Sequence, residues 1–171
     1  MVATSLIHIG NDGAYHERPR GRAQVQAPRF ARWGTASARR YSPVGQILSD
    51  LYYFSRRVHE EMARARRGSG RFSIAVFTSQ PAGAELPEIA CVRGLPALLT
   101  GVRETDTVAR VGADTVAVLL VDSGGDGSRR ASLRLLGRLG ADAPRWAVRV
   151  LEYPDHESIL VDMGLDPAVT R

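Results

Sequence analysis

Two short apolar runs joined by a three-residue turn constrain the fold of this chain more than any other feature. Residues 107–111 read TVARV and residues 115–122 read TVAVLLVD, and Gly112, Ala113 and Asp114 separate them. Short apolar runs bounded by turn residues favour strands. A glycine at such a turn tolerates positive φ and lets a ligand approach the backbone. We therefore predict a β-hairpin over residues 107–122.

One amphipathic helix is predicted ahead of the hairpin, over residues 42–68. Ser42 can cap its N-terminus with Pro43 at the first helical position, and Gly68 can end it. Apolar side chains recur every three or four residues along this segment, at Ile47, Leu51, Phe54, Val58 and Met62.

Further helices and strands are predicted on both sides of the hairpin. The helical pattern over residues 86–106 contains Gly94 and Pro96, and we expect a break there because proline removes a backbone donor and clashes with the preceding turn. Ser128 and Gly140 can cap and stop a short helix after the hairpin. Strands are predicted at 71–80 and 145–153, and a last helix at 154–164. The order αβαββαβα implies an α/β sandwich with helices packed on a central sheet.

Positive charge is concentrated at the N-terminus. Residues 1–43 hold seven arginines against Asp12 and Glu17, whereas the other 128 residues hold 16 arginines and 16 acidic residues. We predict a basic, mostly disordered tail over residues 1–41 and a folded domain over 42–171. A basic arm that meets a partner or an anionic surface is the alternative for the tail. Because the folded part is neutral overall, nucleic-acid binding is not favoured.

Other simple features limit the location and chemistry of the chain. No stretch approaches the roughly 18 apolar residues that a membrane helix needs, and the N-terminus lacks a compact apolar signal core. We therefore expect a cytoplasmic protein without membrane insertion. Cys91 is the only cysteine, so no intrachain disulfide can form, and we expect it in the core. The four histidines show no metal-ligand spacing.

An arginine and an aspartate precede the hairpin turn at a distinctive spacing. Two residues separate Arg103 from Asp106, and five more lead to Gly112. This pattern matches the inhibitory RxxD site and the signature turn of the GGDEF domain of bacterial diguanylate cyclases. The chain resembles that domain over about residues 42–160. The stretch VHEEMARARRGSGRFSIAVF is similar to the family's first helix and strand, and an arginine-rich helix follows the hairpin in the expected order.

The resemblance implies a GGDEF-like α/β sandwich, with a central, mostly antiparallel sheet flanked by helices. It also implies an altered catalytic site. Joining two GTP molecules requires divalent metal held by carboxylates of the first strand and the signature turn. Thr78 stands where the family carries its metal-binding aspartate. The degenerate signature positions read Gly112, Ala113, Asp114, Thr115 and Val116. We expect no catalytic residues, no bound metal or cofactor, and no cyclase activity.

The RxxD pair is intact. In the family this pair binds cyclic di-GMP, the arginine at the O6 and N7 edge of a guanine and the aspartate at its N1 and N2 hydrogens. The family often adds an arginine from the helix after the hairpin, where Arg134 lies at about the right distance and Arg130 one turn earlier. Arg103, Asp106, Arg134 and Arg130 are therefore the expected ligand-binding residues. An ion pair of Arg103 with Glu104 or Asp106, without any role in ligand binding, would account for the same residues.

The resemblance implies a catalytically inactive receptor for cyclic di-GMP, acting through ligand-dependent dimerisation or a bacterial protein partner. Exopolysaccharide production, biofilm formation and motility are the processes it suggests. A second hypothesis is a scaffold that regulates a partner by protein–protein contact and binds no nucleotide. A third is nucleic-acid binding by the basic arm, which would depend strongly on salt, and a fourth is residual cyclase activity.

Overall fold

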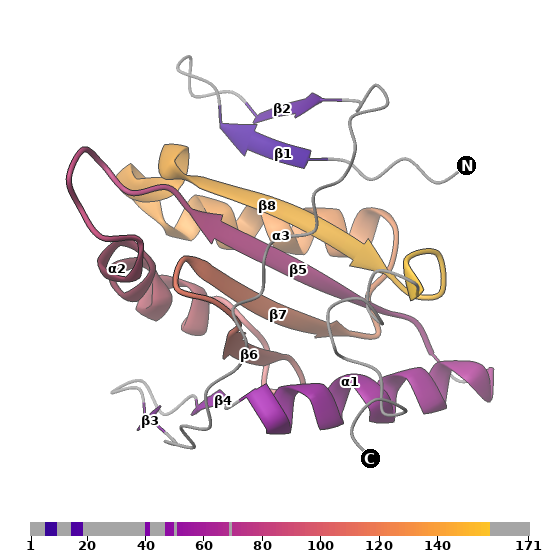
Figure 1. Ribbon diagram of the computed structural model, residues 1–171. Coiled ribbons are helices and arrows are strands. Elements are labelled where there is room, and N and C mark those ends of the chain that lie inside the picture. Colours follow the sequence, from indigo (N-terminus) through magenta and orange to yellow (C-terminus); the bar gives the residue numbers. More distant parts are fainter. Residues whose placement is uncertain are drawn as a thin grey trace.

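The computed structural model describes residues 6–9, 15–18, 40–41, 47–49, 51–68 and 70–157, and the strands of this part form one eight-stranded sheet (Figure 1). The strand order is β2-β1-β8-β5-β7-β6-β4-β3, and every neighbouring pair is antiparallel except β4 and β6. The mostly antiparallel sheet expected from the sequence is thus confirmed. The strands are β1 (Leu6–Ile9), β2 (Tyr15–Arg18), β3 (Arg40–Tyr41), β4 (Ile47–Ser49), β5 (Phe72–Ser79), β6 (Thr107–Arg110), β7 (Thr115–Val121) and β8 (Trp146–Glu152).

Helices cover both faces of this sheet. They are α1 (Leu51–Arg66), α2 (Pro87–Leu99), α3 (Asp126–Arg138) and the 3-10 helix η1 (Gly140–Arg145). Successive side chains of a strand point to opposite faces, and β5 supplies a separate core on each side. Figure 1 shows α1 on one face of the sheet and α2 and α3 on the other. Ile74 packs in one core with the apolar face of α1, whereas Phe77 packs in the other with α2 and α3. None of the helices in the described part is long and apolar enough to cross a membrane.

The predicted hairpin is confirmed as β6 and β7. The two strands pair from Thr107 opposite Leu119 to Arg110 opposite Val116. The amide of Gly112 donates to the carbonyl of Thr115 at 3.2 Å, which closes the turn. All seven residues of β7 are buried because β5 and β6 flank the strand and both faces of the sheet are covered.

The first helix is shorter than predicted. It begins at Leu51, and the preceding residues Ile47–Ser49 form β4, which pairs in parallel with β6 through Leu48 and Val108. Local periodicity placed Ile47 on the helix, but sheet pairing with a distant strand decides its conformation. The predicted cap at Ser42 and Pro43 lies outside the described residues. Gly68 follows the helix with φ +80°, a conformation that glycine adopts readily.

The predicted break in the second helix is wrong, since α2 runs unbroken through Gly94 and Pro96. Pro96 is exposed, and its carbonyl still accepts a hydrogen bond from Thr100 at 3.0 Å. Gly94 is buried, and an added Cβ would overlap the indole of Trp146 and lie 3.0 Å from Leu139 Cδ2. Close packing on Trp146 therefore explains the glycine.

The helix after the hairpin is capped three residues earlier than predicted. Gly125, with φ +55°, precedes its first residue Asp126. Ser128 lies buried inside the first turn, and its hydroxyl donates to the Gly125 carbonyl at 2.8 Å, so the predicted cap at Ser128 is wrong. Gly140 follows the helix with φ +57°, in line with the predicted stop.

Part of the predicted tail belongs to the sheet. Within residues 1–41 the structure describes β1, β2 and β3, and none of them was predicted. β1 pairs with β8 through Leu6 opposite Arg149 and Ile7 opposite Val148. The remainder of this segment lies outside the described residues, as does the predicted last helix beyond residue 157.

The packing of Gly94 gives a stability prediction. Gly94→Ala should lower the free energy of unfolding by about 1–3 kcal/mol, because the new methyl group overpacks the contact with Trp146. Chemical denaturation followed by far-UV circular dichroism measures this loss. Gly127→Ala is the control, since a Cβ there meets nothing within 4 Å and alanine favours the helix by up to about 1 kcal/mol. Equal losses in the two variants would contradict the packing argument.

Candidate functional site

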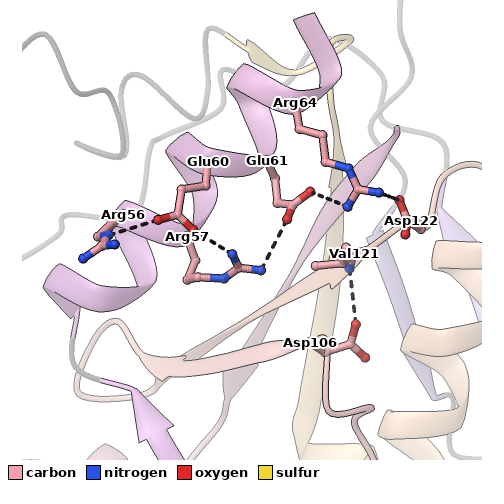
Figure 2. Close-up of polar contacts among 8 residues, drawn as sticks. All are labelled: Arg56, Arg57, Glu60, Glu61, Arg64, Asp106, Val121 and Asp122. Carbon is pink, nitrogen blue, oxygen red and sulfur yellow. Dashed lines mark hydrogen bonds and ion pairs between the residues drawn. The ribbon is translucent and has the colours of Figure 1, made fainter. Parts of the chain in front are cut away.

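The Asp106 carboxylate holds the loop between α2 and β6 in a defined conformation. Its Oδ2 accepts the backbone N–H of Arg103 at 3.0 Å. Its Oδ1 accepts the backbone N–H of Val121 at 3.2 Å, the bond drawn in Figure 2. The amide of Asp106 in turn donates to the Arg103 carbonyl at 3.1 Å. The RxxD spacing therefore forms a closed turn, and this turn is fixed to the end of β7.

The Arg103 side chain projects from this turn into solvent. It is exposed, and within the part of the chain described here its guanidinium makes no hydrogen bond or ion pair. The ion pair with Glu104 or Asp106 that the sequence allows is therefore absent from this conformation. The fork of five N–H donors remains available to a ligand beside the half-buried carboxylate of Asp106.

Arg134 contacts the same loop from α3, whereas Arg130 does not. The Nη2 of Arg134 donates to the Gly101 carbonyl at 3.3 Å. Arg130 lies one turn earlier on α3, is exposed, and forms no hydrogen bond to the loop among the described residues. Arg138, one turn later than Arg134, lies against Gly101 and was not singled out from the sequence. Arg130, Arg134 and Arg138 recur every four residues on one helix, and this spacing could have identified Arg138 from the sequence.

The turn over residues 112–116, whose sequence resembles a degenerate signature turn, is closed by contacts of its own. The Nε of Arg110 donates to the Gly112 carbonyl at 2.9 Å, and its Nη2 donates to the Ala113 carbonyl at 2.8 Å. The Asp114 carbonyl accepts the amide of Ser79 at 2.8 Å. The Asp114 carboxylate accepts the Thr115 hydroxyl at 2.7 Å. Arg110 was not predicted as part of this turn.

The residues at the turn do not match a divalent metal site. Thr78 pairs with Thr115 across β5 and β7, so hydroxyl-bearing residues pair where the resemblance places metal-binding carboxylates. Asp114 is the acidic residue of the turn itself, and Glu88 lies 4.0 Å from the Arg110 guanidinium. Within the described residues no three His, Cys, Asp or Glu side chains group together as metal ligands. Mg²⁺ prefers hard oxygen ligands such as carboxylates, and a guanidinium cation at this point opposes its binding.

Cys91 lies in the core beside this turn, as expected from the sequence. It is fully buried between α2 and the sheet. Burial raises the pKa of the Cys91 thiol above its ordinary value, and the nearby Arg110 opposes this rise only in part. A neutral, buried thiol is a poor nucleophile, so we assign no chemistry to it.

A ladder of ion pairs along α1 reaches the other side of the β7 terminus. Arg57 contacts Glu60 at 2.7 Å and Glu61 at 3.3 Å, and Arg64 joins Glu61 to Asp122 at 3.6 and 3.5 Å (Figure 2). The hydrogen bond from Arg57 is the main reason that the pKa of Glu60 is lowered. Asp122 directly follows Val121, so α1 and the Arg103 loop both hold the end of β7.

Comparison with solved structures confirms the GGDEF-like α/β fold. A DGC protein from Thermotoga maritima matches with a TM-score of 0.58 and 19% sequence identity, over 68% of this chain and 93% of that chain. The GGDEF domain of PA1120 (YfiN or TpbB) from Pseudomonas aeruginosa matches with a TM-score of 0.56 and 19% identity, over 69% of this chain and 86% of that chain. No family model and no curated protein matches the sequence.

The two bonds of the Asp106 carboxylate give a second stability prediction. Asp106→Ala should lower the free energy of unfolding by about 1–3 kcal/mol, because the amides of Arg103 and Val121 lose their acceptor. Glu104→Ala is the matched control, since that side chain is exposed on the same loop. Thermal unfolding of both variants measures the difference. A loss no larger for Asp106→Ala than for Glu104→Ala would show that these bonds do not stabilise the loop.

Proposed function

We propose that this chain binds cyclic di-GMP at Arg103 and Asp106 and acts as a receptor in bacterial signalling without diguanylate cyclase activity. The observation that carries the proposal is that one closed turn holds both the Asp106 carboxylate and an exposed Arg103 guanidinium, which has no ion pair among the described residues. Guanine presents two acceptors, O6 and N7, and donors at N1 and N2. A fork of donors beside a carboxylate complements that edge.

The two backbone hydrogen bonds that the Asp106 carboxylate already accepts are compatible with ligand binding. An ionised carboxylate has about four acceptor positions, and the two backbone bonds use two of them. The remaining positions can accept the N1 and N2 hydrogens of a guanine. Because the backbone bonds already fix the carboxylate, little further ordering is needed on binding, which favours affinity. Arg134, held at Gly101, adds a cation that can stack on a base or contact a phosphate.

The chemistry of the signature turn supports the absence of cyclase activity. Metal-assisted joining of two GTP molecules needs carboxylates that hold divalent cations against the triphosphates. Here Thr115 follows Asp114 in the turn, and the Arg110 guanidinium binds the turn carbonyls. A fixed guanidinium can contact phosphate, but it does not activate a hydroxyl as a metal ion does.

The ligand suggests how the receptor would signal. Cyclic di-GMP carries two identical guanines, so a molecule bound to Arg103 of one copy can present its second guanine to another copy or to a protein partner. A ligand shifts such an equilibrium only through different affinities for the two states. We place this ligand-dependent assembly in the cytoplasm and in the control of exopolysaccharide production, biofilm formation or motility.

An apolar stripe at the N-terminal end of α2, including the preceding Leu86, favours a second candidate function. Leu86, Ile89 and Val92 are 60%, 54% and 54% exposed and recur every three residues. Exposed apolar side chains grouped on one surface are typical of protein–protein contacts. A scaffold that regulates a partner through this stripe would need no nucleotide.

Isothermal titration of cyclic di-GMP into the purified protein separates the two candidates. The wild-type protein should bind, and Arg103→Ala should weaken binding about tenfold to a hundredfold, the worth of one bidentate guanine contact. Arg103→Lys should be weakened as well, because an ammonium keeps the charge but not the fork. Arg56→Ala on α1 is the control, and it should bind as the wild type does. Absence of heat from a folded protein would favour the scaffold.

Incubation with GTP and Mg²⁺ or Mn²⁺ tests the proposed inactivity. Chromatography of the reaction mixture should show GTP unchanged and no cyclic di-GMP. Product formation proportional to protein concentration would contradict the proposal, and an Asp114→Ala variant would then show whether the turn is responsible.

A further inference from the structure

Three of the four arginines of α3 differ from those of α1 in their partners. Each of the four arginines of α1 has a carboxylate within 4.0 Å. Arg130, Arg134 and Arg138 on α3 are exposed, and no ion pair engages them within the described part of the chain. Their positive charges are therefore uncompensated locally, which makes this face of α3 attractive to an anion.

Two of these arginines converge on the loop that carries Arg103. An added Cβ on Gly101 would lie 2.8 Å from Arg138 Cδ and 3.3 Å from Arg138 Nε, so the Arg138 side chain runs along the backbone of Gly101. The Nη2 of Arg134 donates to the carbonyl of the same glycine. Leu135, between them in sequence, would lie 2.5 Å from that Cβ and anchors the loop on the helix. A side chain at position 101 would separate the loop from both arginines.

The acidic groups of this loop do not neutralise the pair. Asp106 bonds with the amides of Arg103 and Val121, and Glu104 is exposed without an ion pair among the described residues. Arg134 and Arg138 thus offer two guanidinium groups next to the turn that presents Arg103. Cyclic di-GMP carries two phosphodiester charges in addition to its guanines, and arginine is well suited to phosphate.

We propose that Arg138 is a phosphate-binding residue of the cyclic di-GMP site, in addition to the residues that recognise guanine. The inference rests on the proposed function. Arg103 and Asp106 take the base edge in this arrangement, and Arg138 takes a phosphate of the same ligand molecule. Its contribution is electrostatic, so it weakens as salt screens the charges.

Titration of cyclic di-GMP at low and at physiological ionic strength tests this role. Arg138→Ala should weaken binding about tenfold at low salt. The affinity of this variant for cyclic di-GMP should also depend less on salt than the affinity of the wild-type protein. Arg138→Lys should retain most of the salt dependence and lie between the two in affinity, because lysine keeps the charge without the fork. Arg56→Ala should match the wild type at both ionic strengths.

The outcomes separate this inference from the proposed function. Arg138 lies in the last turn of α3, where a cation also stabilises the helix end, so the melting temperature of each variant is measured alongside. Weaker binding by Arg138→Lys at an unchanged melting temperature supports the phosphate contact. Binding of Arg138→Ala within about twofold of the wild type at both ionic strengths, with Arg103→Ala impaired, overturns the inference and leaves the receptor function standing. Absence of wild-type binding overturns both.

Discussion

The hydrogen bonds of the Asp106 carboxylate hold the candidate site together. Through them the turn of residues 103–106 is fixed to the amide of Val121, at the end of a strand that is buried along its whole length. The next residue, Asp122, receives Arg64 from α1 on the other side. The end of β7 is thus held from two directions, and the Arg103 guanidinium extends from a support whose position is set by the core of the domain.

The fold could be predicted from the sequence where local pattern and tertiary environment agree. Apolar runs identified β5, β6 and β7, which are buried along most or all of their length, and β8, which is buried at Trp146, Val148 and Leu151. The sequence did not show β1, whose pairing with β8 joins residues more than a hundred positions apart. The sequence also misplaced Ile47, whose conformation is set by sheet pairing with a distant strand. It predicted a break at Gly94 and Pro96 that α2 does not have, and the reason for the glycine, its contact with Trp146, lies far along the chain. Local propensity cannot report such contacts.

The sequence identified residues of the candidate site, but it did not indicate the hydrogen bonds that hold them. The spacing of Arg103 and Asp106 identified the loop, and Arg134 was expected beside it on the following helix. The bond from Val121 to Asp106 spans 15 positions, and that from Arg134 to Gly101 spans 33. Both join a side chain to backbone, for which the sequence carries no residue-type signal. For the same reason, Arg110 at the signature turn emerged only from the structure.

A crystal structure of the protein with cyclic di-GMP tests the central claim most directly, because the claim is about where the guanine lies. We expect the O6 and N7 edge of one guanine on the Arg103 guanidinium, and its N1 and N2 groups on an Asp106 carboxylate that still accepts the Val121 amide. Nucleotide at the turn of residues 112–114, or a site at Arg103 left empty at saturating ligand, would contradict this account.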